Sequence, residues 1–139
     1  MLNRKEVHNS ETLNIQIDRH DQKSYLIELN KDCTKLDLNV ECLENSFSKF
    51  FILNHAESAC ELNINMVLKQ DANCQMGVLD LEKSPLKWNH YVDLKEQGAE
   101  YEILSGQLCQ EHIEKVCDME VRHNAPHTNG QMKNFAVLF

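Results

Sequence analysis

The chain has few glycines and little that predicts helix. Only four of its 139 residues are glycine, and Asn129-Gly130 is the one dipeptide of the kind that closes tight antiparallel hairpins. No segment keeps the apolar spacing of an amphipathic helix over a convincing length. The sequence therefore predicts an all-β protein in which short hairpins are rare.

The sequence also lacks the signals of membrane proteins and of nucleic-acid-binding proteins. No apolar run approaches about 18 residues, and the first segment, MLNRKEVHNSETLNI, has no apolar core of a signal peptide. We therefore expect a cytoplasmic protein that does not associate with a membrane. The net charge is −8 and no basic patch is present, which argues against a nucleic-acid partner.

Enzyme signatures are missing too. The sequence contains no G-x-S-x-G elbow, no G-x-x-x-x-G-K phosphate loop and no H-E-x-x-H motif, so we predict no catalytic activity. An enzyme that acts on carbohydrate would need paired carboxylates and aromatic platforms on one face. Aromatic residues make up only 6% of the chain, which makes that function the least favoured.

Apolar and polar residues alternate through most of the chain, as in strands with one buried face. One set of runs recurs at steps of 23 to 26 residues and begins at Leu13, Leu36, Leu62, Trp88 and Ile113. A second set lies between them at steps of 25 to 26 residues and begins at Tyr25, Phe51, Met76 and Tyr101. Two strands in each repeat are typical of a coiled β-solenoid, whose stacked coils share one core.

An antiparallel sandwich also produces short strands at this density. The constant two-strand period and the scarcity of hairpin turns favour the solenoid. We therefore predict a parallel β-helix of about five coils that forms a single domain over residues 1–139.

Cysteine placement fits such a core. Residues two apart in a strand share a face, and four cysteines are in phase with apolar side chains: Cys42, Cys60, Cys74 and Cys117. We predict that these four thiols fill the core. Cys33 and Cys109 lie in or near predicted turns and are expected to be more accessible. No C-x-x-C pair of the zinc or redox kind occurs, and without a signal peptide we expect reduced thiols.

Cysteines and histidines gather near the C-terminus, and the candidate metal ligands are Cys109, His112, Cys117, His123 and His127. Thiolate and imidazole suit iron, zinc or an iron–sulfur cluster. However, the spacings C-x-x-H and H-x-x-x-H are not specific, and neighbouring strand residues point to opposite faces. The alternative interpretation is that His123 ends a strand and that Pro126 and Asn129-Gly130 form the next turn.

The segment from Leu94 to Phe139 reads LKEQGAEYEILSGQLCQEHIEKVCDMEVRHNAPHTNGQMKNFAVLF. A Gly-Ala turn is followed by a strand, a strand that ends in histidine, a proline-containing turn, a basic residue and an apolar strand. The positions that carry this order are Gly98, Ala99, Ile103, Gly106, Val121, His123, Pro126, His127, Thr128, Gln131, Lys133 and Val137. In this order the last third of the chain resembles the core of the SufB/SufD family of iron–sulfur cluster assembly proteins, closer to the SufD side.

The resemblance implies a right-handed parallel β-helix and a scaffold of the SUF pathway that is not a catalyst by itself. It implies SufB-, SufC- or SufD-type partners and, as a cofactor, an iron–sulfur cluster or iron. Family members continue with further coils and a helical C-terminal region, which carry the cluster-linked cysteines and histidines and the SufC-binding helices. We expect a truncated, shortened member that lacks this region, and the alternative function is a small metal-binding β-solenoid that uses the five candidate ligands.

A solenoid without a cap exposes the strand edges of its last coil. The closing segment NFAVLF is also too apolar to lie comfortably in water. We therefore expect a homodimer or larger homo-oligomer in which the end coils of two copies meet and continue the sheets.

Overall fold

The computed structural model describes residues 2–110 and 112–138, and these residues contain strands and turns but no helix. The eleven strands of the described residues are β1 (Leu2–Val7), β2 (Ser10–Ile17), β3 (Gln22–Leu29), β4 (Lys35–Cys42), β5 (Phe47–Asn54), β6 (Cys60–Leu68), β7 (Asn73–Asp80), β8 (Leu86–Leu94), β9 (Glu100–Cys109), β10 (Lys115–His123) and β11 (Asn129–Leu138). Accordingly, no described helix is long and apolar enough to cross a membrane.

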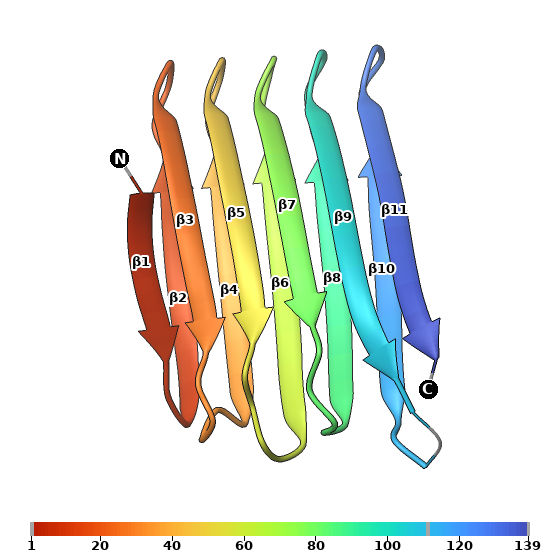
Figure 1. The fold of residues 1–139 in the computed structure, drawn as a ribbon. Helices are drawn as coiled ribbons and strands as arrows, with labels where there is room; N and C mark the ends of the chain where they lie inside the picture. The colour runs from red at the N-terminus through yellow and green to blue at the C-terminus, as the bar shows by residue number, and fades with distance from the viewer. Residues whose placement is uncertain (1, 111, 139) are drawn as a thin grey trace.

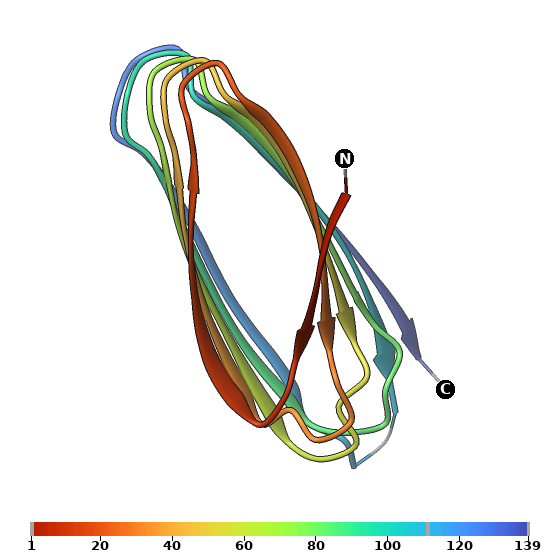
Figure 2. The same cartoon turned by 90° about the vertical axis from the view of Figure 1, so that its left-hand side faces the viewer.

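The strands form two parallel sheets that face each other (Figure 1). The odd-numbered strands make sheet A, in the order β1-β3-β5-β7-β9-β11, and the even-numbered strands make sheet B, in the order β10-β8-β6-β4-β2. The chain descends in sheet A, returns upward in sheet B and advances by one strand spacing per coil, which is a right-handed path (Figures 1 and 2). The prediction of a right-handed parallel β-helix of about five coils is confirmed, and the antiparallel sandwich is excluded because every strand pairing is parallel.

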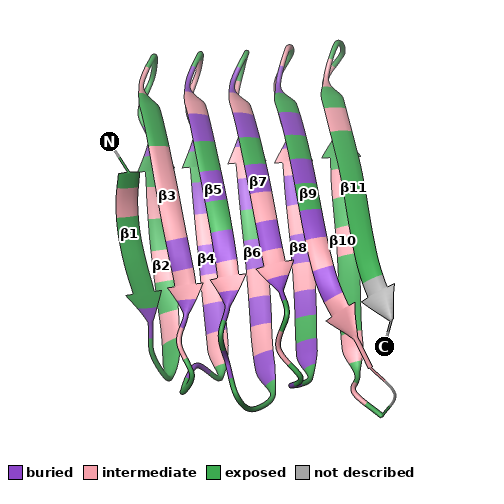
Figure 3. Cartoon of the chain, viewed as in Figure 1, coloured by how far each residue is buried: buried purple, intermediate pink, exposed green. Residues whose placement is uncertain are grey.

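The core lies between the two sheets and is built from columns of inward side chains. In sheet B, for example, Leu38 pairs with Ile64, and Val40 pairs with Met66. All four side chains are buried, as are the other inward residues of the middle coils (Figure 3). Each column is continuous because strand registers repeat without a shift from one coil to the next.

The turns at the upper end of Figure 1 share a left-handed residue in each coil. These residues, with φ between 56° and 79°, are His20, Asn45, Asp71, Gly98 and His127. The amides of the first three donate hydrogen bonds of 3.0–3.1 Å to carbonyls of the next turn, so the turns stack like the strands. At Gly98 a side chain would overlap the Asp71 carboxylate, and glycine is required there for space as well as for its backbone angle.

Two sequence predictions need correction. Pro126 and His127 lie in the turn before β11, but Asn129 and Gly130 are the first residues of β11 and take no part in the turn. In β5 the predicted series named Phe51 as inward, whereas Phe50 is buried and Phe51 points out. The run from Phe50 to Leu53 is apolar at every position, so periodicity alone did not fix its phase.

Candidate functional site

The predicted cysteine–histidine ligands lie at both ends of one strand. Cys109 ends β9 and His112 lies in the turn that follows, whereas His123 ends β10 and His127 lies in the opposite turn. Cys117 is in the first half of β10. A strand of this length spans about 28 Å, far beyond the reach of one metal ion.

The structure therefore does not bring the five candidate ligands together. Nor do the described residues contain any group of three or more His, Cys, Asp or Glu side chains placed to hold a metal ion. His123 has a local contact instead, with 2.7 Å between its Nδ1 and Oγ1 of Thr128 across the turn. Its neighbour in the turn, His127, occupies the left-handed position that Gly98 occupies one coil earlier.

Two cysteines, Cys33 and Cys117, have the opposite burial to the one predicted. Cys33, expected to be accessible, is fully buried and lies 3.8 Å (Sγ–Sγ) from Cys60. Burial raises the pKa of the Cys60 thiol to about 12 and raises the pKa of Cys33 as well, so both stay protonated near neutral pH. A protonated, enclosed thiol is a poor metal ligand and nucleophile, and these side chains act as core hydrophobes.

Cys117 is exposed although it has the predicted inward phase. It pairs with Trp88, which is fully buried in the preceding coil of sheet B. The predicted inward phase of Cys117 is therefore right and its predicted burial is wrong, because among the described residues no strand pairs with the outer edge of β10.

A buried polar group that the sequence did not single out crosses the core. The Nε2 atom of His90 lies 2.6 Å from the Tyr101 hydroxyl oxygen, and Trp88 Nε1 donates a hydrogen bond to His90 Nδ1 at 3.2 Å. Because Nδ1 accepts from Trp88, Nε2 carries the proton and donates to Tyr101. Burial lowers the pKa of His90 to about 3, so the ring is neutral. All three residues are enclosed, which makes this network structural and leaves it no path to a substrate.

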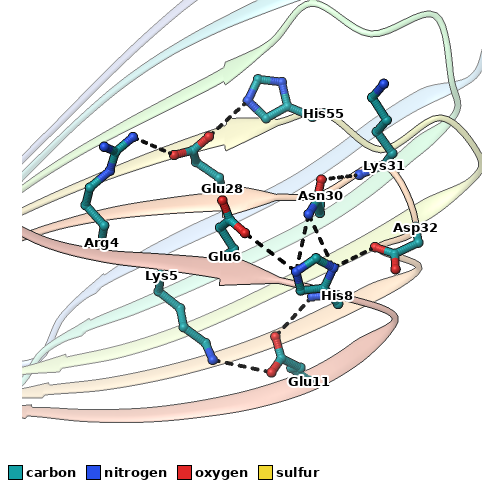
Figure 4. Close-up of polar contacts among 10 residues, drawn as sticks. All are labelled: Arg4, Lys5, Glu6, His8, Glu11, Glu28, Asn30, Lys31, Asp32 and His55. Carbon is teal, nitrogen blue, oxygen red and sulfur yellow. Dashed lines mark hydrogen bonds and ion pairs between the residues drawn. The ribbon is translucent and has the colours of Figure 1, made fainter.

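A second polar group lies on the surface at the N-terminal end (Figure 4). His8 Nδ1 lies 3.2 Å from Asp32 Oδ1, and His8 Nε2 lies 3.7 Å from Glu6 Oε2. Arg4 and His55 both contact Glu28. These groups are partly to largely exposed, and such ion pairs contribute about 0–1 kcal/mol each.

Charged side chains also occupy the inward face of the first coil. Lys5 and Glu11 stand in inward columns and form an ion pair of 3.4 Å between the two sheets. Inward charges on an edge strand discourage pairing with another chain. Lys5 and Glu11 therefore close part of the inward face at the N-terminal end with charge, beside Leu13 and Ile15 on β2, which stay partly exposed.

The C-terminal end is open over most of its length. Met132 on β11 stands in the same inward column as Ile103 on β9, yet Ile103 is 1% exposed and Met132 is 57% exposed. The open coil encloses a hollow of about 240 Å³ whose lining includes Ser105, Cys117, Met119 and Asn134. Beyond β10 and β11 no described strand pairs with their outer edges. This end is the candidate functional site, because inward side chains that are buried in the middle coils are exposed here.

One corner of the C-terminal coil is closed. The side chain of Lys115, 4% exposed, donates to Asp80 Oδ2 at 2.6 Å and to the Glu82 carbonyl at 2.8 Å. Asn54 donates to the other Asp80 oxygen at 3.0 Å. The buried carboxylate and ammonium are thus both paired and hydrogen-bonded, which fixes β10 on the coil beneath it.

Comparison with protein-family models, with curated proteins and with solved structures gave no match.

Proposed function

We propose that this protein is a non-catalytic scaffold of the SufB/SufD type that binds another β-solenoid, or a second copy of itself, through its C-terminal coil. The observation that carries the proposal is the exposure of inward side chains on that coil. Met132, Met119 and Val121 continue columns that are buried in every middle coil. A further coil from a partner would cover them as the inner coils cover one another.

The backbone of the C-terminal coil also supports this proposal. The outer edges of β10 and β11 present N–H and C=O groups that a partner strand can pair with. Association through these edges adds hydrogen bonds and buries the open hollow at once. Strand addition of this kind derives affinity from the main chain and specificity from alternate side chains.

The two ends of the solenoid are not equivalent in this role. Stacking the C-terminal coil of one copy on the N-terminal coil of another, in the register of the inner coils, would place Lys5 over Asn134 and Glu11 over Cys117 and bury both charges. Pairing of two C-terminal coils avoids that desolvation cost and closes the assembly at a dimer. A SufB- or SufD-type partner with an open coil would make the same contact.

The link to iron–sulfur cluster assembly rests on the resemblance of the segment from Leu94 to Phe139. A right-handed parallel β-helix is the fold that this resemblance implies, and the matching residues lie in β9, β10, β11 and the turn before β9 and the turn before β11. Val137 is one of those residues and lies in β11, whereas Phe139, which ends the segment, falls outside the described residues.

The proposal is tested with one charged substitution inside the coil and one outside it. Met132→Lys places a charge on the open inward face, whereas Val116→Lys changes an equally apolar, 42% exposed residue on the outer face of β10. Sedimentation velocity at about 1–100 μM should show weakened association for the first variant only. Binding of purified SufB, SufC and SufD to both variants should follow the same order.

Anaerobic reconstitution with iron and sulfide separates the scaffold from the metal-binding alternative. Visible thiolate-to-iron absorbance is expected with a partner present, and elemental analysis of the isolated chain should give well below one metal per chain. A monomer at micromolar concentration that also fails to bind any of the three purified proteins would remove the proposal.

A further inference from the structure

The outer face of sheet A is unusually apolar for a surface in water. Phe51, Leu104 and Phe135 point outward from β5, β9 and β11 and are 43%, 48% and 63% exposed. Leu53 and Leu79 are partly exposed between them. A hollow of about 460 Å³ runs across the strands of this face, which is turned toward the viewer in Figure 3. Contiguous apolar patches of this kind mark interaction surfaces.

The outer face of sheet B has the opposite character. Asn39 donates to Asn14 at 3.0 Å, and Asn63 and Asn89 extend a second ladder at 2.8 Å per step. These side chains bond one another, and at one step the Asp37 carboxylate, along the solenoid axis and leave a polar surface. The outer face of sheet A, and not that of sheet B, would therefore gain free energy when a partner removes it from water.

Strand registers give the hollow an internal symmetry about β7. Lys49 on β5 and Glu102 on β9 are the neighbours of Gln75 on either side of β7. Two residues further along the strands, Phe51 and Leu104 flank Gly77 in the same way. Across the face, one row therefore has a positive, a neutral and a negative side chain in order, and the next row has a glycine between two apolar side chains.

Glycine at the centre of the second row has a steric reason. A Cβ at position 77 would lie 2.6 Å from Cδ2 of Phe51, because the phenyl ring lies flat over the glycine. The Phe51 ring therefore fills the space above Gly77 at the centre of this row, and Leu104 lies on the other side of the glycine. Lys49 and Glu102 are two strand spacings apart, about 9.6 Å, and do not pair within one copy.

We propose that this face binds a second copy of the chain, face to face, about a two-fold axis parallel to β7. The axis passes over Gln75 and Gly77 and exchanges β5 of one copy with β9 of the other. Lys49 then faces Glu102 of the second copy, and Phe51 packs against Leu104 of the second copy. Both contacts occur twice, as an isologous interface requires.

The size of the face agrees with a moderate interface. An axis over β7 overlaps the five strands from β3 to β11. Five strands at about 4.8 Å and eight residues at about 3.3 Å give about 630 Å² per copy, or about 1,300 Å² in total. That total is at the lower limit of specific, stable interfaces. Sheets pack face to face at about 10 Å with strands within about 30°, which a two-fold axis along the strands permits. We expect dissociation constants in the micromolar range.

A charge swap tests the proposed geometry. Lys49→Glu and Glu102→Lys each place like charges opposite each other twice, and each should weaken association by about 10-fold or more. The double variant K49E/E102K restores opposite charges and should return association to within about 3-fold of the original. Both side chains are exposed on the sheet surface, so circular dichroism of all three variants should match the original chain.

The end-coil variant Met132→Lys distinguishes this interface from the proposed scaffold contact. With both contacts present, Met132→Lys leaves a dimer that Glu102→Lys dissolves, and sedimentation equilibrium measures each step. If the single variants associate as well as the original chain, or if the double variant is as weak as either, the face-to-face dimer is wrong. Neither result would bear on the C-terminal coil.

Discussion

Met76 and Met132 stand in one inward column of sheet A, with Ile103 between them, and they differ sharply in burial. Met76 is 3% exposed and Met132 is 57% exposed. Residue type, sheet and phase are the same, so the difference comes from position along the solenoid. Met76 has a coil on each side, whereas no described strand lies beyond β11, which carries Met132. In this fold, inward phase and burial are therefore separate properties.

The largest expected effect comes from the corner where the end coil is as closed as an inner coil. Lys115→Met removes the ammonium group that pairs with Asp80 and leaves a carboxylate buried without its counter-ion. We expect a loss of about 3–5 kcal/mol in the free energy of unfolding. Urea denaturation measures it, and Lys87→Met, at an exposed position on the neighbouring strand β8, is the matched control. Equal midpoints for the two variants would contradict a buried pair.

Replacing each methionine by alanine tests the difference in burial directly. Met76→Ala should lower the free energy of unfolding by about 2–5 kcal/mol, because it leaves a cavity in a closed column. Met132→Ala should cost less than about 0.5 kcal/mol when measured on dilute monomer. Thermal unfolding at low micromolar concentration checks both. A similar cost at both positions would mean that the end coil is covered in solution.

An inner-coil histidine should make stability fall in acid. Burial lowers the pKa of His90 to about 3, against an ordinary value of 6.5. The unfolded chain therefore binds a proton that the folded chain does not, and the stability from His90 is complete above about pH 6.5 and lost as the pH falls toward 3. At pH 5 we expect a loss of about 2 kcal/mol relative to pH 7.5.

Urea midpoints at pH 7.5 and pH 5 measure this loss, and His90→Gln should make the two midpoints converge. An unchanged acid slope in the variant would show that other groups control it. The variant also tests the hydrogen bond to Tyr101, because its midpoint at pH 7.5 reports the loss of that partner.

The smallest effects are expected in the stacked turns. Gly98→Ala forces a side chain into a left-handed position and into the Asp71 carboxylate, and should cost about 1–2 kcal/mol. At the equivalent position of the end coil, His127→Gly relieves the left-handed angle and should stabilise the fold by about 0.5 kcal/mol. Differential scanning calorimetry of both variants gives the signs. Stabilisation by Gly98→Ala would contradict the stacked-turn geometry.

Sequence periodicity was sufficient for most of the fold and insufficient for β5. Alternation at a repeat of about 25 residues predicted paired strands in each coil, and residues such as Leu36, Leu62 and Trp88 lie inward as expected. In β5 the outer face is as apolar as the inner one, and hydrophobicity did not distinguish Phe50 from Phe51. The register with β3 and β7 decided that strand, and the same outward apolar residues form the face proposed to dimerise.

The candidate site was less predictable than the fold. Nearness in sequence suggested a joint site for Cys109 and His123, but an extended strand separates its ends by about 28 Å. The charged closure by Lys5 and Glu11 was equally hidden, because the pair joins the two sheets across the interior. Contacts between strands of different sheets depend on the path of the chain around the coil, which periodicity does not record.

The amino-acid sequence by itself determined that this chain makes strands, that two strands form each repeat, and which side chains of most strands point inward. These properties follow from local alternation, because side chains of a strand alternate between its two faces. Only the tertiary structure decided which inward residues are buried, which end of the solenoid is closed by charge, and which outer face stays apolar. Those properties depend on the neighbouring coil, and a residue near an open end has the same local pattern as one in the middle but lacks that neighbour.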